Sequence, residues 1–260
     1  MRHRARRRFS QNFLIDRVCI DRIVGSVAPT RGDHIVEIGP GLGALTEPLL
    51  DAVGHMDAIE VDRDAARMLE ERFAGQSLSV HCVDFLEFDL ASLGSDLRLV
   101  GNLPYHISTP ILFTVNQSRD FIKDCHFMLQ REVVDRMVAA PASADYGRLS
   151  VMLQCRWSIE KLFDVPPTSF RPQPKVWSSV VRMLPEQTIA ISDAGVFHRI
   201  VEAAFSKRRK TLRNALRGLV SEEDFETCSI DPGRRGETLS VADFAGLANQ
   251  LSRRITASSE

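Results

Sequence analysis

The chain has few of the features that mark secreted or membrane proteins. Its 5 cysteines are odd in number, lie far apart and form no CxxC pattern, which argues against a disulfide framework and a zinc site. No apolar run approaches the roughly 20 residues that cross a bilayer. The opening residues, MRHRARRR, lead into polar FSQN rather than into an apolar signal core. We therefore expect a cytoplasmic monomer that keeps its cysteines in the core and binds neither metal nor membrane.

An excess of charge of one sign is also missing. The 33 lysines and arginines nearly balance the 34 aspartates and glutamates, so only local clusters can indicate nucleic-acid binding. With 44% hydrophobic and 26% charged residues, the chain can bury a substantial core and is not disordered. A length of 260 residues is typical of one large α/β domain with a smaller appendage.

Short apolar runs typical of strands alternate with helical patterns over most of the chain. Strands are expected at 34–38, 57–61, 78–81, 97–101, 125–130, 149–156 and 177–183, and helices at 16–28, 45–53, 63–73, 110–117 and 133–140. Right-handed crossovers between such units place the carboxyl ends of the strands along one edge, where a doubly wound sheet binds its ligand. The pattern predicts a Rossmann-like α/β fold with a seven-stranded, mostly parallel sheet.

The composition changes after Pro185. Helices are expected at 193–206, 208–219 and 241–253, with no strand between them. We therefore expect two domains, an α/β domain at 1–185 that starts with a basic segment at 1–15, and a small all-α C-terminal domain at 186–260.

A glycine-rich turn follows the first predicted strand. Gly39, Gly41 and Gly43 allow the backbone to approach a ligand closely. The spacing is GxGxG, and Ala44 stands where the dinucleotide fingerprint GxGxxG has its third glycine, which disfavours NAD. An ordinary tight turn between strand and helix remains an alternative for this motif alone.

Acidic residues follow the next two strands. Glu60 lies 21 residues beyond Gly39, where a carboxylate can accept from both hydroxyls of a ribose. Asp84 ends the third strand and is suited to accept from the exocyclic amine of adenine, with a turn cap as the alternative. Acidic residues at three successive strand ends, Glu37, Glu60 and Asp84, are hard to explain by capping alone. Since the chain has no P-loop GxxxxGK[ST], a cofactor with adenosine but no polyphosphate fits best, and S-adenosylmethionine is such a molecule.

The fourth strand ends in Asn102-Leu103-Pro104-Tyr105. The amino group of a nucleobase is a poor nucleophile because its lone pair is delocalised into the ring, so an enzyme must hold it with hydrogen-bond acceptors. The side-chain oxygen of Asn102 and a carbonyl near Leu103 or Pro104 can accept from the amine, Pro104 stiffens the turn and Tyr105 offers a face for stacking. A simple β-turn is the alternative interpretation.

At these motifs the chain resembles the ribosomal RNA adenine dimethyltransferases of the KsgA type, and the resemblance covers nearly all of it. The matching segments are Phe9-Ser10-Gln11-Asn12-Phe13-Leu14, the glycine loop at 37–46, Asn102–Tyr105 with Ile107-Ser108-Thr109-Pro110, Tyr146-Gly147-Arg148-Leu149-Ser150, Phe170-Arg171-Pro172-Gln173-Pro174-Lys175-Val176 and Arg208-Arg209-Lys210-Thr211-Leu212-Arg213-Asn214. In this order they are very specific. Two positions depart from the family pattern, Ser10 where glycine is usual and His106 where asparagine is usual.

The resemblance implies a class I methyltransferase fold, S-adenosylmethionine as cofactor and a set of site residues. Gln11, Asn12 and Leu14 would close over the cofactor, and Gly41 would also bind it. Gly39 would contact its methionine part, Glu60 its ribose and Asp84 its adenine, with Asn102 serving both cofactor and target amine. Phe170, in a rigid exposed loop, would pair with Tyr105 to sandwich the extruded adenine. The implied reaction is dimethylation of two adjacent adenosines near the 3′ end of small-subunit ribosomal RNA, within the pre-30S particle, late in assembly.

Two basic clusters are candidates for RNA contact. One lies in the N-terminal segment, and the other comprises Arg208, Arg209, Lys210, Arg213 and Arg217. On a helix starting near Arg209, residues 209, 213 and 217 would form one stripe, with the acidic residues 222–226 lying elsewhere or repelling RNA.

Three alternatives remain open at this point. The antibiotic-resistance relatives of the Erm type methylate one adenine of large-subunit ribosomal RNA, and a non-catalytic assembly or transcription factor could use the same fold. A DNA adenine or protein glutamine methyltransferase could also use a turn that contains asparagine and proline.

Overall fold

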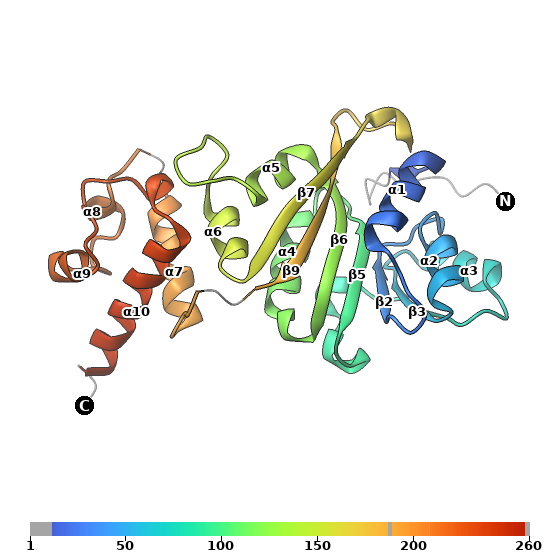
Figure 1. Cartoon of the computed structure of the whole chain (residues 1–260), viewed down its shortest axis with the longest axis horizontal. Coiled ribbons are helices and arrows are strands. Elements are labelled where there is room, and N and C mark those ends of the chain that lie inside the picture. Colours follow the sequence, from blue (N-terminus) through green and yellow to red (C-terminus); the bar gives the residue numbers. More distant parts are fainter. Residues whose placement is uncertain (1–11, 187–188, 208, 258–260) are drawn as a thin grey trace. The chain divides into compact units, whose positions relative to one another are not determined.

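The protein is described by a computed structural model that covers residues 12–186, 189–207 and 209–257. Its main sheet has seven strands in the order β4-β3-β2-β5-β6-β9-β7 (Figure 1). The strands are β2 (Ile35–Ile38), β3 (Met56–Ile59), β4 (Leu78–His81), β5 (Leu97–Asn102), β6 (Ile122–Gln130), β7 (Trp157–Val165) and β9 (Ser178–Pro185). Strands β4, β3, β2, β5 and β6 run parallel, and β9 is antiparallel to β6. The predicted seven-stranded, mostly parallel α/β fold is thus confirmed.

Helices precede, connect and follow the parallel strands. They are α1 (Arg17–Val27), α2 (Thr46–Val53), α3 (Arg63–Arg72), α4 (Ser108–Gln117) and α5 (Arg131–Met137). Two begin at aspartates that accept main-chain N–H bonds in the first turn, Asp16 for α1 and Asp62 for α3, which satisfies amides that have no partner within the helix. All residues of β2 and β3 are buried, as expected for central parallel strands covered on both faces.

The strand order reverses between β2 and β5. From β2 the chain continues to β3 and β4 on one side, whereas β5 and β6 lie on the other, and ligands bind at such a switch point. The two strands approach closely at their carboxyl ends, where a Cβ on Gly101 would lie 2.6 Å from the Ile38 carbonyl oxygen. Glycine at 101 is therefore required by the packing of β2 against β5.

A second, two-stranded sheet joins the two ends of this α/β unit. Strand β1 (Phe13–Leu14) pairs antiparallel with β8 (Phe170–Arg171). Phe170 is 3% exposed and belongs to the same hydrophobic cluster as Leu14. The loop after Phe170 is exposed as expected at Arg171, Pro172 and Gln173, whereas Phe170 itself is not, because strand pairing turns its side chain into the core.

The predicted strand at 149–156 is also wrong, because α6 (Arg148–Gln154) occupies it and β7 follows. A short apolar run does not distinguish a buried strand from a buried helix by its pattern alone. Ser150 fixes the start of the helix, since its hydroxyl accepts from the Gly147 N–H at 3.0 Å and donates to the Arg136 carbonyl at 2.6 Å.

The chain forms two compact units, and each is described by itself. The first comprises Met1–Val134 and Ile159–Pro185, and the second Asp135–Ser158 and Glu186–Glu260. The grouping differs from the expected division after residue 185, because α6 packs against α7 (Ala194–Phe205). Arg148 Nη1 and Glu202 Oε1, 3.0 Å apart, join these two helices.

The second unit is helical at its C-terminal end. It contains α8 (Leu212–Ala215), α9 (Glu222–Thr227) and α10 (Val241–Ala257). The helix expected at 208–219 is much shorter than predicted, because the amides of Leu212 and Arg213 bond to the carbonyls of Arg234 and Pro232 and Gly218 has a positive φ of 84°. Helix α9 was not predicted.

All five cysteines are free thiols. Cys19, Cys125 and Cys155 lie in the core as expected, whereas Cys82 is exposed and Cys228 is half-buried. In the part of the chain that the structure describes, no helix has both the length and the apolar character that a membrane span requires.

Candidate active site

The first compact unit has a cavity at the carboxyl edge of its sheet. Its lining includes Asn12, Leu14, Glu37, Gly39, Gly41, Glu60, Asp84, Asn102, Leu103, Pro104, Tyr105 and His106. The ends of β2, β3, β4 and β5 thus meet at one hollow, as the parallel strands predicted. Gln11 lies outside the described residues.

The glycine turn leaves room inside this cavity. Gly39 has a φ of 67°, its amide donates to the Ile59 carbonyl at 2.9 Å, and a Cβ added to it would meet no atom within 4 Å. A Cβ on Gly41 would instead lie 3.2 Å from the Phe13 ring. Gly39 therefore borders open space that a side chain would partly fill, which suits the close approach of a ligand.

Glu60 is held by the backbone around the turn. Its Oε2 accepts from the Gly41 N–H at 3.1 Å and its Oε1 from the Asp62 N–H at 2.9 Å. The side chain is 4% exposed, and burial raises the pKa of its carboxyl. A carboxylate oxygen has more than one acceptor site, so these bonds orient Glu60 and leave capacity for the hydroxyls of a ribose.

Glu37 carries a second buried carboxyl beside the cavity. It accepts from the Thr46 hydroxyl at 2.6 Å, and burial raises its pKa to about 7, with the nearby Glu60 carboxylate adding to the shift. A carboxyl with such a pKa is partly protonated near neutral pH, which limits the negative charge at this edge of the sheet. Sequence reasoning counted Glu37 among the acidic strand ends but did not anticipate Thr46 as its partner.

Asp84 caps a turn, which is one of the two roles expected for it, and its contact with adenine stays a prediction. Its Oδ1 accepts from the Leu86 N–H at 3.0 Å and so caps the short 3₁₀ turn Phe85–Glu87. The same residue lines the cavity. Capping uses one carboxylate oxygen and fixes the side chain, which leaves the other oxygen as an acceptor.

The Asn102–Tyr105 turn is fixed from three sides. The Asn102 side-chain amide nitrogen donates to the Asn12 carbonyl at 3.0 Å, the Leu103 N–H to the Met128 carbonyl at 3.0 Å, and the Ile107 N–H to the Pro104 carbonyl at 3.2 Å. Because the Asn102 nitrogen is engaged, the acceptor oxygen is the end of the amide left for a substrate amine. The Pro104 carbonyl accepts one bond and has a second lone pair, so Leu103 or Pro104 can supply the second, main-chain acceptor.

Tyr105 lies in the same turn and lines the cavity. Its hydroxyl and the Ser178 hydroxyl are 2.6 Å apart, and burial raises the pKa of the phenol. The hydrogen bond fixes the ring beside Asn102, whereas Phe170 is buried and does not line the cavity. Phe170 therefore lies outside the cavity lining in this structure, and its expected pairing with Tyr105 around an adenine stays a prediction.

His106 is exposed and lines the same cavity. The family pattern has asparagine there, and nothing in the structure explains the change.

The basic cluster does not form the expected stripe. Arg209 and Arg217 are exposed, but they lie outside the four-residue helix α8 that contains Arg213. Arg213 forms a salt bridge with Glu222, Nε to Oε1 at 2.8 Å, so the acidic segment neither lies elsewhere nor simply repels. Lys210 is exposed, and Arg208 and the arginines of the N-terminal segment lie outside the described residues.

Comparison with known proteins gives a consistent result. Residues 2–253 match the family model described as ribosomal RNA adenine dimethylase. The chain is 53% identical over 254 residues to the ribosomal RNA small subunit methyltransferase A of Thiobacillus denitrificans, covering 97% of this chain and 100% of that protein. It is 52% identical to the protein of the same name from Aromatoleum aromaticum, covering 97% of this chain and 96% of that one.

Solved structures share the fold. A dimethyladenosine transferase from Plasmodium falciparum superposes with a TM-score of 0.82 at 23% identity, covering 93% of this chain and 98% of that one. The 23S rRNA methyltransferase ErmE superposes with a TM-score of 0.70 at 24% identity, covering 93% and 100%. At these identities the likeness concerns the fold alone.

Proposed function

Because this chain belongs to the ribosomal RNA adenine dimethylase family, we propose that it uses S-adenosylmethionine to dimethylate the exocyclic amines of two adjacent adenosines near the 3′ end of small-subunit ribosomal RNA. The substrate particle is the pre-30S subunit late in assembly, and the enzyme acts in the cytoplasm as a monomer. The names of its relatives with half or more identical residues support the choice of the small subunit.

One observation carries the proposal. The cavity gathers Gly39, Glu60 and Asp84 at the same edge as Asn102 and Tyr105. The open space beside Gly39 and the oriented, buried carboxylate of Glu60 fit the amino-acid and ribose parts of the cofactor. The remaining Asp84 oxygen fits the adenine amine. Cofactor and target base are thus held on neighbouring strand ends.

When bound, S-adenosylmethionine supplies an electrophilic methyl group on a positively charged sulfur. The residues at 102–105 prepare the nucleophile. Oδ1 of Asn102 and the carbonyl of Leu103 or Pro104 accept the N–H bonds of the amine, two in the first transfer and one in the second, which draws its lone pair out of the ring and aims it at the methyl carbon. Tyr105 holds the base by stacking.

No strong general base is needed in this arrangement. After transfer, the methylated amine is acidic and gives up a proton readily, and the acceptors around Asn102 can pass it to water. The half-buried phenol of Tyr105 keeps its proton, because partial burial raises its pKa, so Tyr105 positions the base rather than removing a proton.

We also propose that RNA is held by the exposed basic residues Arg209, Lys210, Arg213 and Arg217 together with Arg208 and the N-terminal arginines. Lysine and arginine neutralise phosphates and release counterions, which makes affinity depend on salt. Shape and unstacked bases, more than a sequence code, would guide recognition.

The test is methyl transfer from labelled cofactor onto immature small subunits, with protein-free large-subunit RNA as the competing substrate. Digestion of the product and mass spectrometry should find dimethyladenosine in small-subunit RNA. Dimethyladenosine confined to large-subunit RNA would instead assign the Erm-type activity. A chain that binds no S-adenosylmethionine in calorimetry would be a non-catalytic factor.

A further inference from the structure

Three histidines surround a buried aspartate near the amino ends of β2 and β3, whereas the cavity lies at the carboxyl ends of these strands. His34 directly precedes β2, and His55 directly precedes β3, which contains Asp57. His81 ends the neighbouring strand β4. None of these four residues lines the cavity described above, so the cluster is separate from the proposed methyl-transfer site.

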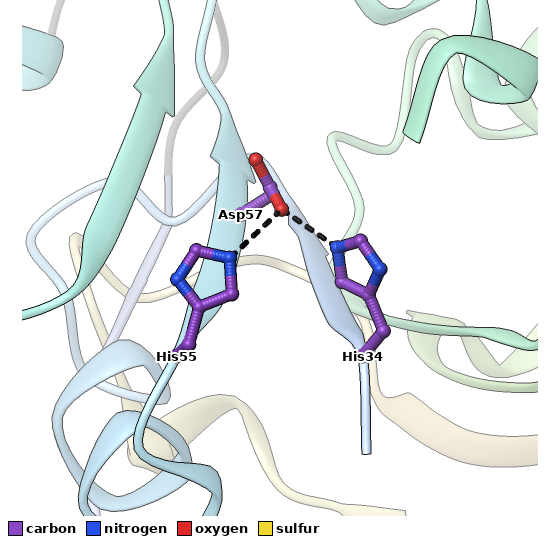
Figure 2. Close-up of side chains that lie close together, drawn as sticks. All are labelled: His34, His55 and Asp57. Carbon is purple, nitrogen blue, oxygen red and sulfur yellow. Dashed lines mark hydrogen bonds and ion pairs between the residues drawn. The ribbon is translucent and has the colours of Figure 1, made fainter. Parts of the chain in front are cut away.

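Strand geometry brings the side chains together. Residues two apart on a strand share a face, so His55 and Asp57 point the same way. The pairing of Ile35 with Met56 makes His34 the neighbour of His55. Figure 2 shows the two imidazole rings turned toward the Asp57 carboxylate from either side. The potential ligand atoms of the three residues all lie within 4.8 Å of one another.

The hydrogen bond of His55 decides which nitrogen faces the aspartate. Nδ1 of His55 lies 3.1 Å from the Ser77 carbonyl oxygen, and a carbonyl can only accept, so Nδ1 carries the proton. In the neutral ring, Nε2 then directs its lone pair at Oδ2 of Asp57, 3.9 Å away. Two facing lone pairs repel each other, whereas a cation between them would bind both.

The distances are close to those of a transition-metal site. Metal bonds to histidine nitrogen and carboxylate oxygen are about 2.0–2.2 Å long, so two ligand atoms of a tetrahedral ion lie roughly 3.4 Å apart. The 3.9 Å gap between His55 and Asp57 would therefore close slightly when an ion binds. His34 Nε2 lies 2.7 Å from the same oxygen. Metal binding would lengthen that contact and exchange this hydrogen bond for a coordinate bond, with the ring proton moving to Nδ1.

His81 and Asp57 complete the arrangement. His81 Nε2 lies 2.6 Å from Oδ1 of Asp57, which leaves Oδ2 to face the other two histidines. Asp57 is 4% exposed, and a buried carboxylate is costly unless it is paired. Metal-binding histidines usually donate their other ring N–H to a main-chain or carboxylate oxygen, and metal-binding carboxylates are usually hydrogen-bonded as well. His55 has such a bond to the Ser77 carbonyl, and Asp57 has one with His81.

We propose that His34, His55 and Asp57 bind one divalent transition-metal ion of the zinc class, with His81 as a positioning residue for the carboxylate. Two imidazoles and one carboxylate favour zinc, nickel or copper over calcium and magnesium, which prefer sets of oxygen ligands. The ion ties the start of β2 to the start of β3 and stabilises the fold without entering methyl transfer. This inference does not rest on the proposed function.

The probe is Zn²⁺, titrated by calorimetry into the untagged, chelator-treated full chain. We expect one strong site per chain. His55→Ala and His34→Ala should each weaken it by about tenfold or more. His198→Ala is the matched control, because His198 is a partly exposed histidine of the other compact unit, near Glu202; it should leave Zn²⁺ affinity unchanged.

Thermal unfolding provides a second readout. Binding to the folded state alone stabilises it, so Zn²⁺ should raise the unfolding midpoint of the wild type and of His198→Ala by more than it raises that of His55→Ala at the same Zn²⁺ concentration. The side chain of His55 is 57% exposed, so its loss should not prevent folding without metal. Three outcomes would each overturn the proposal. In the first, Zn²⁺ does not bind at one site per chain. In the second, it binds wild type and His55→Ala equally well, and in the third, its binding is lost only in Cys82→Ser.

Discussion

The Asn102 side chain donates a hydrogen bond to the main-chain carbonyl of Asn12 at 3.0 Å. This contact ties the end of β5 to the residue before β1. It also sets the direction of the amide, because the nitrogen is used and the oxygen remains. A residue that reads as a turn former in the sequence thus becomes an oriented acceptor in the structure.

Replacement of Asn102 by alanine should lower the rate of methyl transfer by roughly 10²-fold or more, since removal of one oriented polar group from an active site typically costs this much. Asn102 is half-buried, so the variant should still fold. Single-turnover rates with saturating cofactor, together with circular dichroism, test both statements. Turnover equal to wild type would contradict the proposed role of the Asn102 oxygen.

Replacement of Glu60 by alanine should weaken binding of S-adenosylmethionine by about 1–3 kcal/mol, because it removes ribose contacts and leaves the Gly41 and Asp62 amides without their acceptor. Calorimetry measures this affinity directly. Glu47→Ala is the control, since Glu47 is a half-exposed carboxylate that pairs with Arg72. Equal losses in the two variants would show that the effect is not specific to the cavity.

Glu37 should make stability depend on pH in a defined direction. Its pKa rises from 4.5 in the unfolded chain to about 7 in the folded protein, so the folded state binds the proton more tightly. The resulting stabilisation is fully present below about pH 4.5 and is lost as pH rises through 7, a change of about 3 kcal/mol.

Glu37→Gln keeps an acceptor for the Thr46 hydroxyl but cannot ionise. The variant should therefore gain stability relative to wild type between pH 5 and pH 8. Urea unfolding at several pH values measures the difference. A constant difference across this range would show that Glu37 titrates normally in the folded protein.

Replacement of Gly101 by alanine should destabilise the fold by about 1–3 kcal/mol, because the new Cβ would lie 2.6 Å from the Ile38 carbonyl oxygen and main-chain atoms cannot move aside easily. Gly246→Ala in helix α10 is the control. A Cβ there meets nothing within 4 Å, so the substitution should be neutral or stabilise by up to about 1 kcal/mol. Similar unfolding midpoints for the two variants would argue against close packing of β2 on β5.

Arg209 should contribute more to RNA binding than Arg213. Both are exposed, but Arg213 already pairs with Glu222 and must give up that contact to bind a phosphate. Arg209→Ala should weaken RNA binding and lower the slope of log affinity against log salt concentration by about one. Arg213→Ala should have a smaller effect on both. The double variant should leave cofactor affinity unchanged. Filter binding at several salt concentrations measures the slopes, and an unchanged slope in the double variant would exclude this surface.

Much of the α/β unit could be predicted because local patterns of apolar residues indicate its strands and helices. Strand β4 matches the expected bounds, and the other parallel strands differ by a few residues at their ends. The meeting of Glu60, Asp84 and Asn102 followed from topology, since neighbouring parallel strands end at one edge. What each of these residues does there stays a prediction.

Features that depend on distant contacts were missed. Strands β1 and β8 have two residues each, too few for a periodic pattern, and without their pairing the burial of Phe170 could not be foreseen. The stripe of arginines failed because tertiary hydrogen bonds to the 232–234 loop shortened the helix. The histidines around Asp57 are spread from 34 to 81 without metal-ligand spacing, and only the register of β2, β3 and β4 brings them together.

The pairing of β1 with β8 has a consequence for synthesis of the protein. Residues near Asn12, which form one wall of the cavity, are held by Phe170 and Arg171. A nascent chain that has not yet released this later segment from the ribosome lacks the partner of β1. The cofactor cavity is thus completed only near the end of translation of the α/β unit. A shorter nascent chain therefore lacks a complete binding cavity for the methyl donor.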